Sequence, residues 1–164
     1  MELTLDLIYL IGDIMDKFGF GMMRLPQLDE NDPTKVDIEQ VKEMVDVYIA
    51  NGGKYFDTAY PYHNGVSELV LKEAVVDRYP REDIIVATKL PIFSVSKPED
   101  MEKYFNEQLE KCGVEYFDYY LIHNINEMTH HAVYDFDSFD FVRQKKAEGK
   151  IKNIGFSFHD KPER

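Results

Sequence analysis

The stretch Tyr55–Tyr62 limits the possible folds more than any other part of this 164-residue chain. It begins as a short aromatic and apolar run, which is typical of a buried strand, and Pro61 ends that run. We therefore expect Asp57 at the C-terminal end of a strand and Tyr62 in the loop that follows. A carboxylate and a phenol are thereby placed at the same edge of the predicted sheet.

Two later segments repeat this design. The apolar run 84–88 leads into Lys89, and the apolar run 116–122 leads into His123. In a parallel barrel the C-terminal ends of the strands lie at one face, so an acid, a phenol, an ammonium and an imidazole are expected to converge there. This convergence favours a barrel over an open sheet.

Helical patterns separate the predicted strands, and turn residues mark their ends. Asp37 is expected to cap the first helix, and Ser96 with Glu99 is expected to form a capping box at the start of the third. Helices are predicted at Ile38–Ala50, Ser67–Arg78 and Lys97–Lys111 and within Tyr134–Ala147, and the first and fifth strands at Phe18–Met23 and Asn153–Phe158.

The alternation of strands and helices implies right-handed βαβ units and a parallel sheet. The expected fold class is α/β, of the TIM (β/α)8-barrel type, truncated here to about five β/α units. No Gly-x-Gly-x-x-Gly run joins a strand to a helix, which weakens the case for an open dinucleotide-binding sheet. Residues 18–164 are assigned to this partial barrel, and residues 1–17 to a divergent N-terminal segment.

The formal net charge of −12 narrows the range of partners. Nucleic acids and anionic membranes need an extended basic surface, so neither is expected as a partner. Cys112 is the only cysteine, which excludes an internal disulfide framework, and a cytoplasmic location follows as the default. The apolar run Leu7–Ile11 is too short to span a bilayer, so we expect it to pack under the barrel or to pair with another chain.

Several separated motifs resemble the successive strand motifs of the aldo-keto reductases, in the same order and with matching spacing. The motifs are Gly19-Phe20-Gly21, Phe56-Asp57-Thr58-Ala59 followed by Tyr62, Ala87-Thr88-Lys89, Leu121-Ile122-His123 and Ile154-Gly155-Phe156-Ser157. The sequences of residues 21–26, 60–65 and 157–160 further resemble those of a bacterial and archaeal branch of that family. Full-length members of this branch carry a ferredoxin-like iron–sulfur segment after the barrel, and no such cluster is expected in this chain.

The resemblance implies a catalytic tetrad of Asp57, Tyr62, Lys89 and His123 in an enzyme that reduces an aldehyde or ketone. The chemistry asks for the same residue types. A phenol is a poor proton donor at neutral pH unless a nearby cation favours its ionised form, and Lys89 would supply that cation. Asp57 would hold the ammonium in place, and His123 would donate a hydrogen bond to the substrate oxygen.

The resemblance also implies a nicotinamide cofactor, NADP or NAD, because no side chain can provide a hydride. Cofactor contacts are expected at Gly21, Met22, Asp57 and Ser157. Phe158 stands where the common reductases have an asparagine that helps to bind the carboxamide, which leaves Ser157 for that role.

The family barrel has eight strands, whereas this sequence predicts five, so the aromatic residue and the basic loop that hold the rest of the cofactor cannot be assigned. Two alternatives therefore stay open: a non-catalytic remnant or regulatory subunit, and a metal-dependent barrel hydrolase. No metal is expected, because the histidines show no metal-binding spacing.

An incomplete barrel leaves its first and fifth strands as open edges and its inner face uncovered. We therefore expect a homo-oligomer, or completion of the barrel by another chain. Candidates for the inner face are Phe20, Phe56, Ile85, Ala87, Tyr120 and Ile122.

Overall fold

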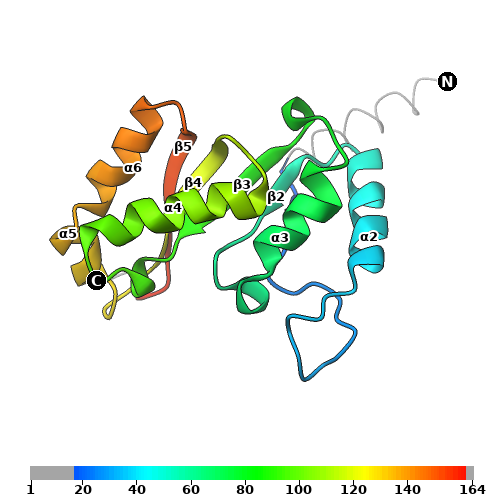
Figure 1. The fold of residues 1–164 in the computed structure, drawn as a ribbon, viewed down its shortest axis with the longest axis horizontal. Coiled ribbons are helices and arrows are strands. Elements are labelled where there is room, and N and C mark those ends of the chain that lie inside the picture. Colours follow the sequence, from blue (N-terminus) through cyan, green and yellow to red (C-terminus); the bar gives the residue numbers. More distant parts are fainter. Residues whose placement is uncertain (1–16, 162–164) are drawn as a thin grey trace.

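A computed structural model describes residues 17–161 of the chain. Five parallel strands form one sheet in the order β1-β2-β3-β4-β5 (Figure 1). The expected N-terminal segment, including Leu7–Ile11, lies almost wholly outside the described residues. The strands are β1 (Gly19–Gly21), β2 (Tyr55–Asp57), β3 (Ile85–Leu90), β4 (Phe117–Ile125) and β5 (Ile151–Phe158).

Helices connect these strands and cover one side of the sheet, as Figure 1 shows for α2, α3 and α4. The strand order never reverses, as it would in a doubly wound sheet, so the expected barrel-type α/β fold is confirmed. Among the described residues, no helix has the length and apolar character needed to cross a membrane. The helices are α2 (Ile38–Ala50), α3 (Ser67–Leu71), α4 (Pro98–Cys112), α5 (His130–Asp135) and α6 (Ser138–Ala147).

The ends of the helices follow local chemistry, with one correction. Asp37 caps α2 as predicted, because its carboxylate accepts a hydrogen bond from the backbone N–H of Gln40 at 3.1 Å. The predicted capping box of Ser96 and Glu99 was wrong, because Asp100 and not Glu99 is the acidic residue of the box. Asp100 accepts hydrogen bonds from the backbone N–H groups of Ser96 (3.0 Å) and Lys97 (3.2 Å). The capped residue lies one position later than expected, so the carboxylate that reaches back also shifts by one position.

One predicted helix differs from the structure in its interior. The second helix is α-helical only as α3, and it continues as a π-helical turn, Lys72–Val76. The fourth helix, predicted within Tyr134–Ala147, is confirmed as α6, and α5 is a separate short helix before it, because Asp137 between them has a φ of 51°. A positive φ at a non-glycine residue is incompatible with a continuous helix.

The strand register corrects the expected inner face of the barrel. Phe20 pairs with Phe56, and paired residues lie on one face of a sheet. Phe56 is fully buried and packs against Tyr48 of α2, so this pair faces the helices. Tyr120 likewise packs against Phe105 of α4. Four of the six residues assigned to the inner face (Phe20, Phe56, Tyr120 and Ile122) therefore lie on the helix side, and Ile85 and Ala87 lie on the inner side.

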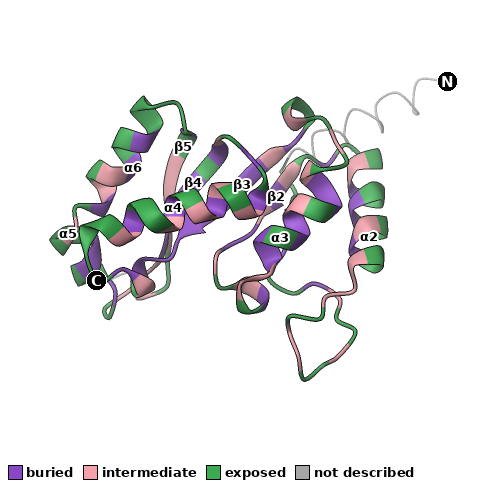
Figure 2. Ribbon diagram, in the orientation of Figure 1, coloured by how far each residue is buried: buried purple, intermediate pink, exposed green. Residues whose placement is uncertain are grey.

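The hydrophobic core lies between the sheet and its helices, and buried residues are concentrated there on β3 and β4 (Figure 2). The face opposite the helices carries half-exposed side chains, such as Tyr55 and Tyr119, whose ring centroids are 5.4 Å apart. An open inner face is thus less apolar than the sequence suggested, because the largest strand residues are covered within the chain.

A buried carboxylate ties three strands together at their amino-terminal ends. Asp118 of β4 is 5% exposed, and it accepts hydrogen bonds from Arg81 (2.6 Å), the backbone N–H of Val86 in β3 (2.9 Å) and Lys152 of β5 (2.9 Å). Burial raises the pKa of Asp118, but the hydrogen bonds from Val86, Lys152 and Arg81 outweigh this effect and hold that pKa below its usual range.

We predict that Asp118→Asn lowers the free energy of unfolding by about 3 kcal/mol at pH 7, since it leaves a partly buried Arg81 without its anion. The stabilisation by Asp118 is present above the unfolded-state pKa near 3.8 and is lost as the pH falls through the lower folded-state pKa. Urea unfolding at several pH values measures both effects.

The matched control is Asp140→Asn, which removes an exposed carboxylate paired with Arg143 and should change stability by less than about 0.5 kcal/mol. Equal stability of the Asp118→Asn variant and the wild type at pH 7 would contradict this role of Asp118.

Candidate active site

The side chain of Lys89 is the centre of the site. It projects from the carboxyl half of β3 and is 5% exposed. Its ammonium donates hydrogen bonds to Oδ1 of Asp57 at 2.7 Å and to the carbonyl of Thr58 at 2.7 Å. A buried ammonium needs such partners, so the end of β2 holds the charge in place.

Tyr62 reaches the site through a tightly bent loop. It begins a short 3-10 turn, Tyr62–Gly65, in which His63 and Asn64 have φ angles of 51° and 52°. The ring of His63 anchors this turn: its Nε2 accepts the backbone N–H of Leu25 at 2.9 Å, and its Nδ1 lies 3.0 Å from the carbonyl of Pro33. His63 is therefore a structural residue that ties the loop after β2 to the loop after β1.

The bent loop places the phenol next to the charge and the imidazole. The ammonium of Lys89 lies 4.9 Å from the centroid of the Tyr62 ring. The ring of His123, at the carboxyl end of β4, lies 5.9 Å from the Tyr62 ring in an edge-to-face arrangement. The structure thus brings together the predicted residues Asp57, Tyr62, Lys89 and His123.

His123 is neutral at pH 7. Burial, which is the largest cause, together with the positive charge of Lys89 and the neighbouring His159, lowers its pKa to about 4. Its Nδ1 is buried and has no hydrogen-bond partner within residues 17–161. The His123 ring is only 8% exposed, so water does little to stabilise its charged form.

A buried polar network supports the strand that carries Lys89. Gln108 of α4 donates to the carbonyl of Lys89 at 3.1 Å and to Oε1 of Glu68 at 2.6 Å. Thr88 donates to the same Oε1 at 2.7 Å, and Tyr120 donates to Oε1 of Gln108 at 2.7 Å. Burial raises the pKa of Glu68, although the hydrogen bonds from Gln108 and Thr88 partly offset this effect. No periodicity or motif in the sequence indicated this network.

A cavity of about 540 Å3 opens above these groups. Tyr62, Lys89, His123 and Ser157 line it, and Ser157 Oγ accepts the backbone N–H of Asn124 at 2.7 Å. Asp57 does not line the cavity and instead contacts it through Lys89.

The two expected cofactor residues of β1 have different surroundings. A side chain at Gly21 would meet nothing within 4 Å, so a ligand could approach its backbone closely. The Met22 side chain is fully buried in the core, and its backbone N–H donates to the carbonyl of Asp57 at 2.8 Å. The neighbouring Met23 lines the cavity instead.

Three further cavity residues were not singled out from the sequence: Met23, Phe93 and Asn124. Asn124 has a φ of 59°. It directly follows His123 at the end of a predicted strand, and this position was the signal by which the sequence could have indicated it. Phe93 lies in a loop after β3, and its ring is 5.6 Å from that of His123. Nothing in its local sequence indicated this contact.

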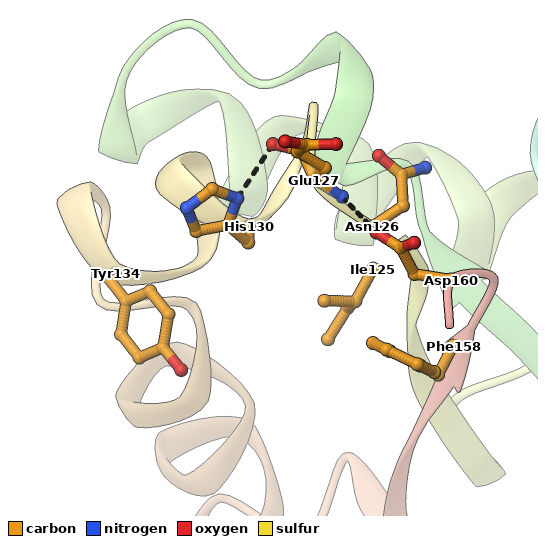
Figure 3. A pocket seen from close by; sticks show the side chains of 7 residues that line it. All are labelled: Ile125, Asn126, Glu127, His130, Tyr134, Phe158 and Asp160. Atoms are coloured by element: carbon orange, nitrogen blue, oxygen red, sulfur yellow. Dashed lines mark hydrogen bonds between the residues drawn. The ribbon is translucent and has the colours of Figure 1, made fainter. Parts of the chain in front are cut away.

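A second cavity, of about 510 Å3, lies between the loop after β4 and the end of β5 and shares no lining residue with the first (Figure 3). The backbone N–H of Glu127 donates to Asp160 at 2.9 Å, and Nδ1 of His130 lies 2.8 Å from the carbonyl of Glu127. This second cavity contains none of the four predicted catalytic residues. Within residues 17–161, no three His, Cys, Asp or Glu side chains are grouped to hold a metal ion.

Comparisons with known proteins agree with this geometry. A sequence model described as "Aldo/keto reductase family" matches residues 17–164. The 4-dihydromethyl-trisporate dehydrogenase of Mucor mucedo is 34% identical over 117 residues, which are 68% of this chain and 32% of that protein. An aldo-keto reductase of Mycolicibacterium smegmatis is 28% identical over 147 residues, which are 89% of this chain and 47% of that protein.

Solved structures show the same fold. An aldo/keto reductase from Brucella melitensis superposes with a TM-score of 0.58 at 28% identity, over 86% of this chain and 48% of the other. An aldo-keto reductase from Klebsiella pneumoniae, solved with NADPH, gives a TM-score of 0.61 at 21% identity, over 84% and 44% of the two chains.

The described residues form part of a (β/α) barrel, with Asp57, Lys89 and His123 in the carboxyl halves of the strands and Tyr62 in the loop after β2. The chain belongs to the aldo/keto reductase family. It spans about half or less of the length of the relatives described above.

We predict that His123 titrates with a midpoint near 4. Lys89→Met should raise this pKa because it removes a nearby positive charge, but the value should stay below 6.5 because burial is the larger cause. A pH titration of the imidazole carbon signals by NMR measures both values.

Lys72→Met is the matched control, because it removes an exposed lysine that pairs with Asp77. This control should leave the His123 titration unchanged. A wild-type midpoint near 6.5, or the same midpoint with and without Lys89, would contradict the assigned electrostatics.

Proposed function

We propose that this chain provides the proton-transfer site of an NAD(P)H-dependent reductase that converts a small aldehyde or ketone to an alcohol. The observation that carries the proposal is the buried Lys89 ammonium, which is bonded to Asp57 and lies 4.9 Å from the Tyr62 ring centroid. If the ion pair between Lys89 and Asp57 were only structural, there would be no reason for a phenol and a neutral imidazole to line the same cavity as Lys89.

Each residue has a separate role in this proposal. Tyr62 donates the proton to the substrate oxygen as negative charge develops there. Lys89 places a positive charge 4.9 Å from the centroid of the Tyr62 ring, and Asp57 holds the ammonium. His123, being neutral, donates a hydrogen bond from Nε2 to the same oxygen and so orients the carbonyl. A neutral donor does this without releasing its own proton to the substrate.

The residues present fit the nicotinamide end of a dinucleotide. Gly21 offers an open approach along its backbone, and Ser157 and Asn124 line the cavity with polar atoms. When bound, the nicotinamide would supply the hydride. No residue described here is assigned to the adenosine or pyrophosphate end.

We further propose that the working form is an oligomer or a complex in which another chain completes the barrel. Within residues 17–161, β1 and β5 each have one unpaired edge, and such edges favour pairing. The half-exposed inner face, with Tyr55 and Tyr119, is available for the same contact.

Tyr62→Phe should reduce carbonyl reduction by about 100-fold or more in the active form, with little change in cofactor affinity, because the lost proton acts in the transition state. Steady-state kinetics with NADPH and a panel of small aldehydes measures this loss.

Tyr60→Phe is the matched control, because the Tyr60 hydroxyl donates to Glu107 rather than to a cavity residue. Activity of this control should stay within a few-fold of wild type. Comparable activity of the Tyr62→Phe and Tyr60→Phe variants would rule out Tyr62 as the proton donor.

The chain alone should bind NADPH only weakly, with a dissociation constant above about 1 μM. The site holds only one end of the cofactor, and the net charge of −12 provides no general attraction for phosphates. Isothermal titration calorimetry tests this expectation, and sub-micromolar binding would show that contacts to the other end exist within this chain.

A further inference from the structure

Strand β3 continues beyond its neighbour β2, and Lys89 lies past the point where that pairing ends. The last residue of β2 is Asp57, and its register partner in β3 is Ala87. The carbonyl of Ala87 points toward β2, because it accepts the backbone N–H of Thr58 at 2.9 Å. The backbone groups of alternate residues in a strand point the same way, so the carbonyl of Lys89 is directed past the end of β2.

The amide of Gln108 takes the place of a strand neighbour at this point. Gln108 projects from α4 and is fully buried, and its Nε2 donates to the carbonyl of Lys89 at 3.1 Å. The ammonium of the same lysine donates to the carbonyl of Thr58 at 2.7 Å. Lys89 is therefore held at its backbone by α4 and at its side chain by the end of β2.

Two neighbours fix the orientation of the Gln108 amide. The hydroxyl of Tyr120 donates to its Oε1 at 2.7 Å, and Oε1 of Glu68 accepts from its Nε2 at 2.6 Å. Burial raises the pKa of the Tyr120 phenol well above its usual value, so the hydroxyl keeps its proton and stays a donor. An amide that accepts on one side and donates on the other cannot turn over, so its N–H groups stay directed at Glu68 and Lys89.

Packing alone is a poor explanation for this amide. Gln108, Glu68 and Thr88 are fully buried between the sheet and its helices, where polar groups are costly unless all their hydrogen bonds are made. Oε2 of Glu68 is buried and has no hydrogen-bond partner within residues 17–161. Apolar side chains of similar size would fill this space without that cost. The contact with Lys89 gives the buried amide a reason that stability does not.

We propose that Gln108 is a positioning residue of the proton-transfer site, an inference that rests on the proposed carbonyl reduction. Its amide fixes the backbone from which the Lys89 side chain leaves β3, and so fixes the ammonium at 4.9 Å from the centroid of the Tyr62 ring. Gln108 does not line the active-site cavity, so it acts only through Lys89.

A reciprocal exchange of two buried side chains isolates this contact. Glu68→Gln combined with Gln108→Glu keeps the total volume, one carboxyl group and one amide, and position 108 still accepts from Tyr120. It loses the N–H that is directed at the carbonyl of Lys89. In the active form of the protein, the exchange should lower kcat for aldehyde reduction by about 10-fold or more with little change in NADPH affinity, because a small displacement of a catalytic group has a large effect on rate.

Glu68→Gln alone is the matched control. It keeps an oxygen that accepts from Thr88 and Gln108, and it leaves the Gln108 amide on Lys89. Its kcat should stay within about 2-fold of wild type. Gln108→Met, which has a side chain of similar size without the N–H, should show the same loss as the exchange and replaces it if the exchange does not fold. Equal kcat in the control and in the variants at position 108 would overturn the proposal.

An NMR titration of His123 tests the position of Lys89 without any turnover. After burial, the charge of Lys89 is the next cause of the low His123 pKa of about 4, and a less firmly held ammonium would lower that pKa less. The midpoint should rise in the exchange and in Gln108→Met, toward that of Lys89→Met, and should stay at the wild-type value in Glu68→Gln. An unchanged midpoint in both variants at position 108 would overturn the proposal. A shifted midpoint in a protein that reduces no aldehyde would support the placement of Lys89 by Gln108 and count against the proposed function.

Discussion

The buried ion pair between Lys89 and Asp57 is the interaction on which the site depends. A lysine that is only 5% exposed is tolerable only where its ammonium can donate hydrogen bonds, here to a carboxylate and a carbonyl that both come from the end of β2. The pairing of Asp57 with Ala87 therefore fixes the site, since a slip of one residue would turn Lys89 toward the helices. The same charge adds to the larger effect of burial in lowering the pKa of His123, and it lies against the Tyr62 ring.

Two sets of contacts away from the cavity hold the strands that carry this ion pair in place. Asp118 joins β3, β4 and β5 at their amino-terminal ends through Arg81, Lys152 and a backbone amide. On the helix side, Gln108 holds the carbonyl of Lys89. Register and strand position are thus set by residues that never contact the cavity, which separates stability at one end from chemistry at the other.

The sequence predicted the parallel strands, the first helix and the convergence of four polar side chains, because each depends on local periodicity or on spacing within one motif. The catalytic roles of these four residues stay predictions. It misassigned Phe20, Phe56, Tyr120 and Ile122, because alternation gives two faces without saying which one the helices cover. It also missed Phe93 and the Glu68–Gln108 contact, because both join segments far apart in the chain. Long-range packing decides such contacts, and no pattern within a single segment records it.

The most direct test of the central claim is the transfer of deuterium from NADPH, labelled at the reactive C4 position, to a small aldehyde by the active form of the protein. The expected product is an alcohol with one deuterium on its carbinol carbon, and the Lys89→Met variant should show a severe loss of this product. An alcohol without the label, or undiminished transfer in the Lys89→Met variant, would contradict the assignment of this site to carbonyl reduction.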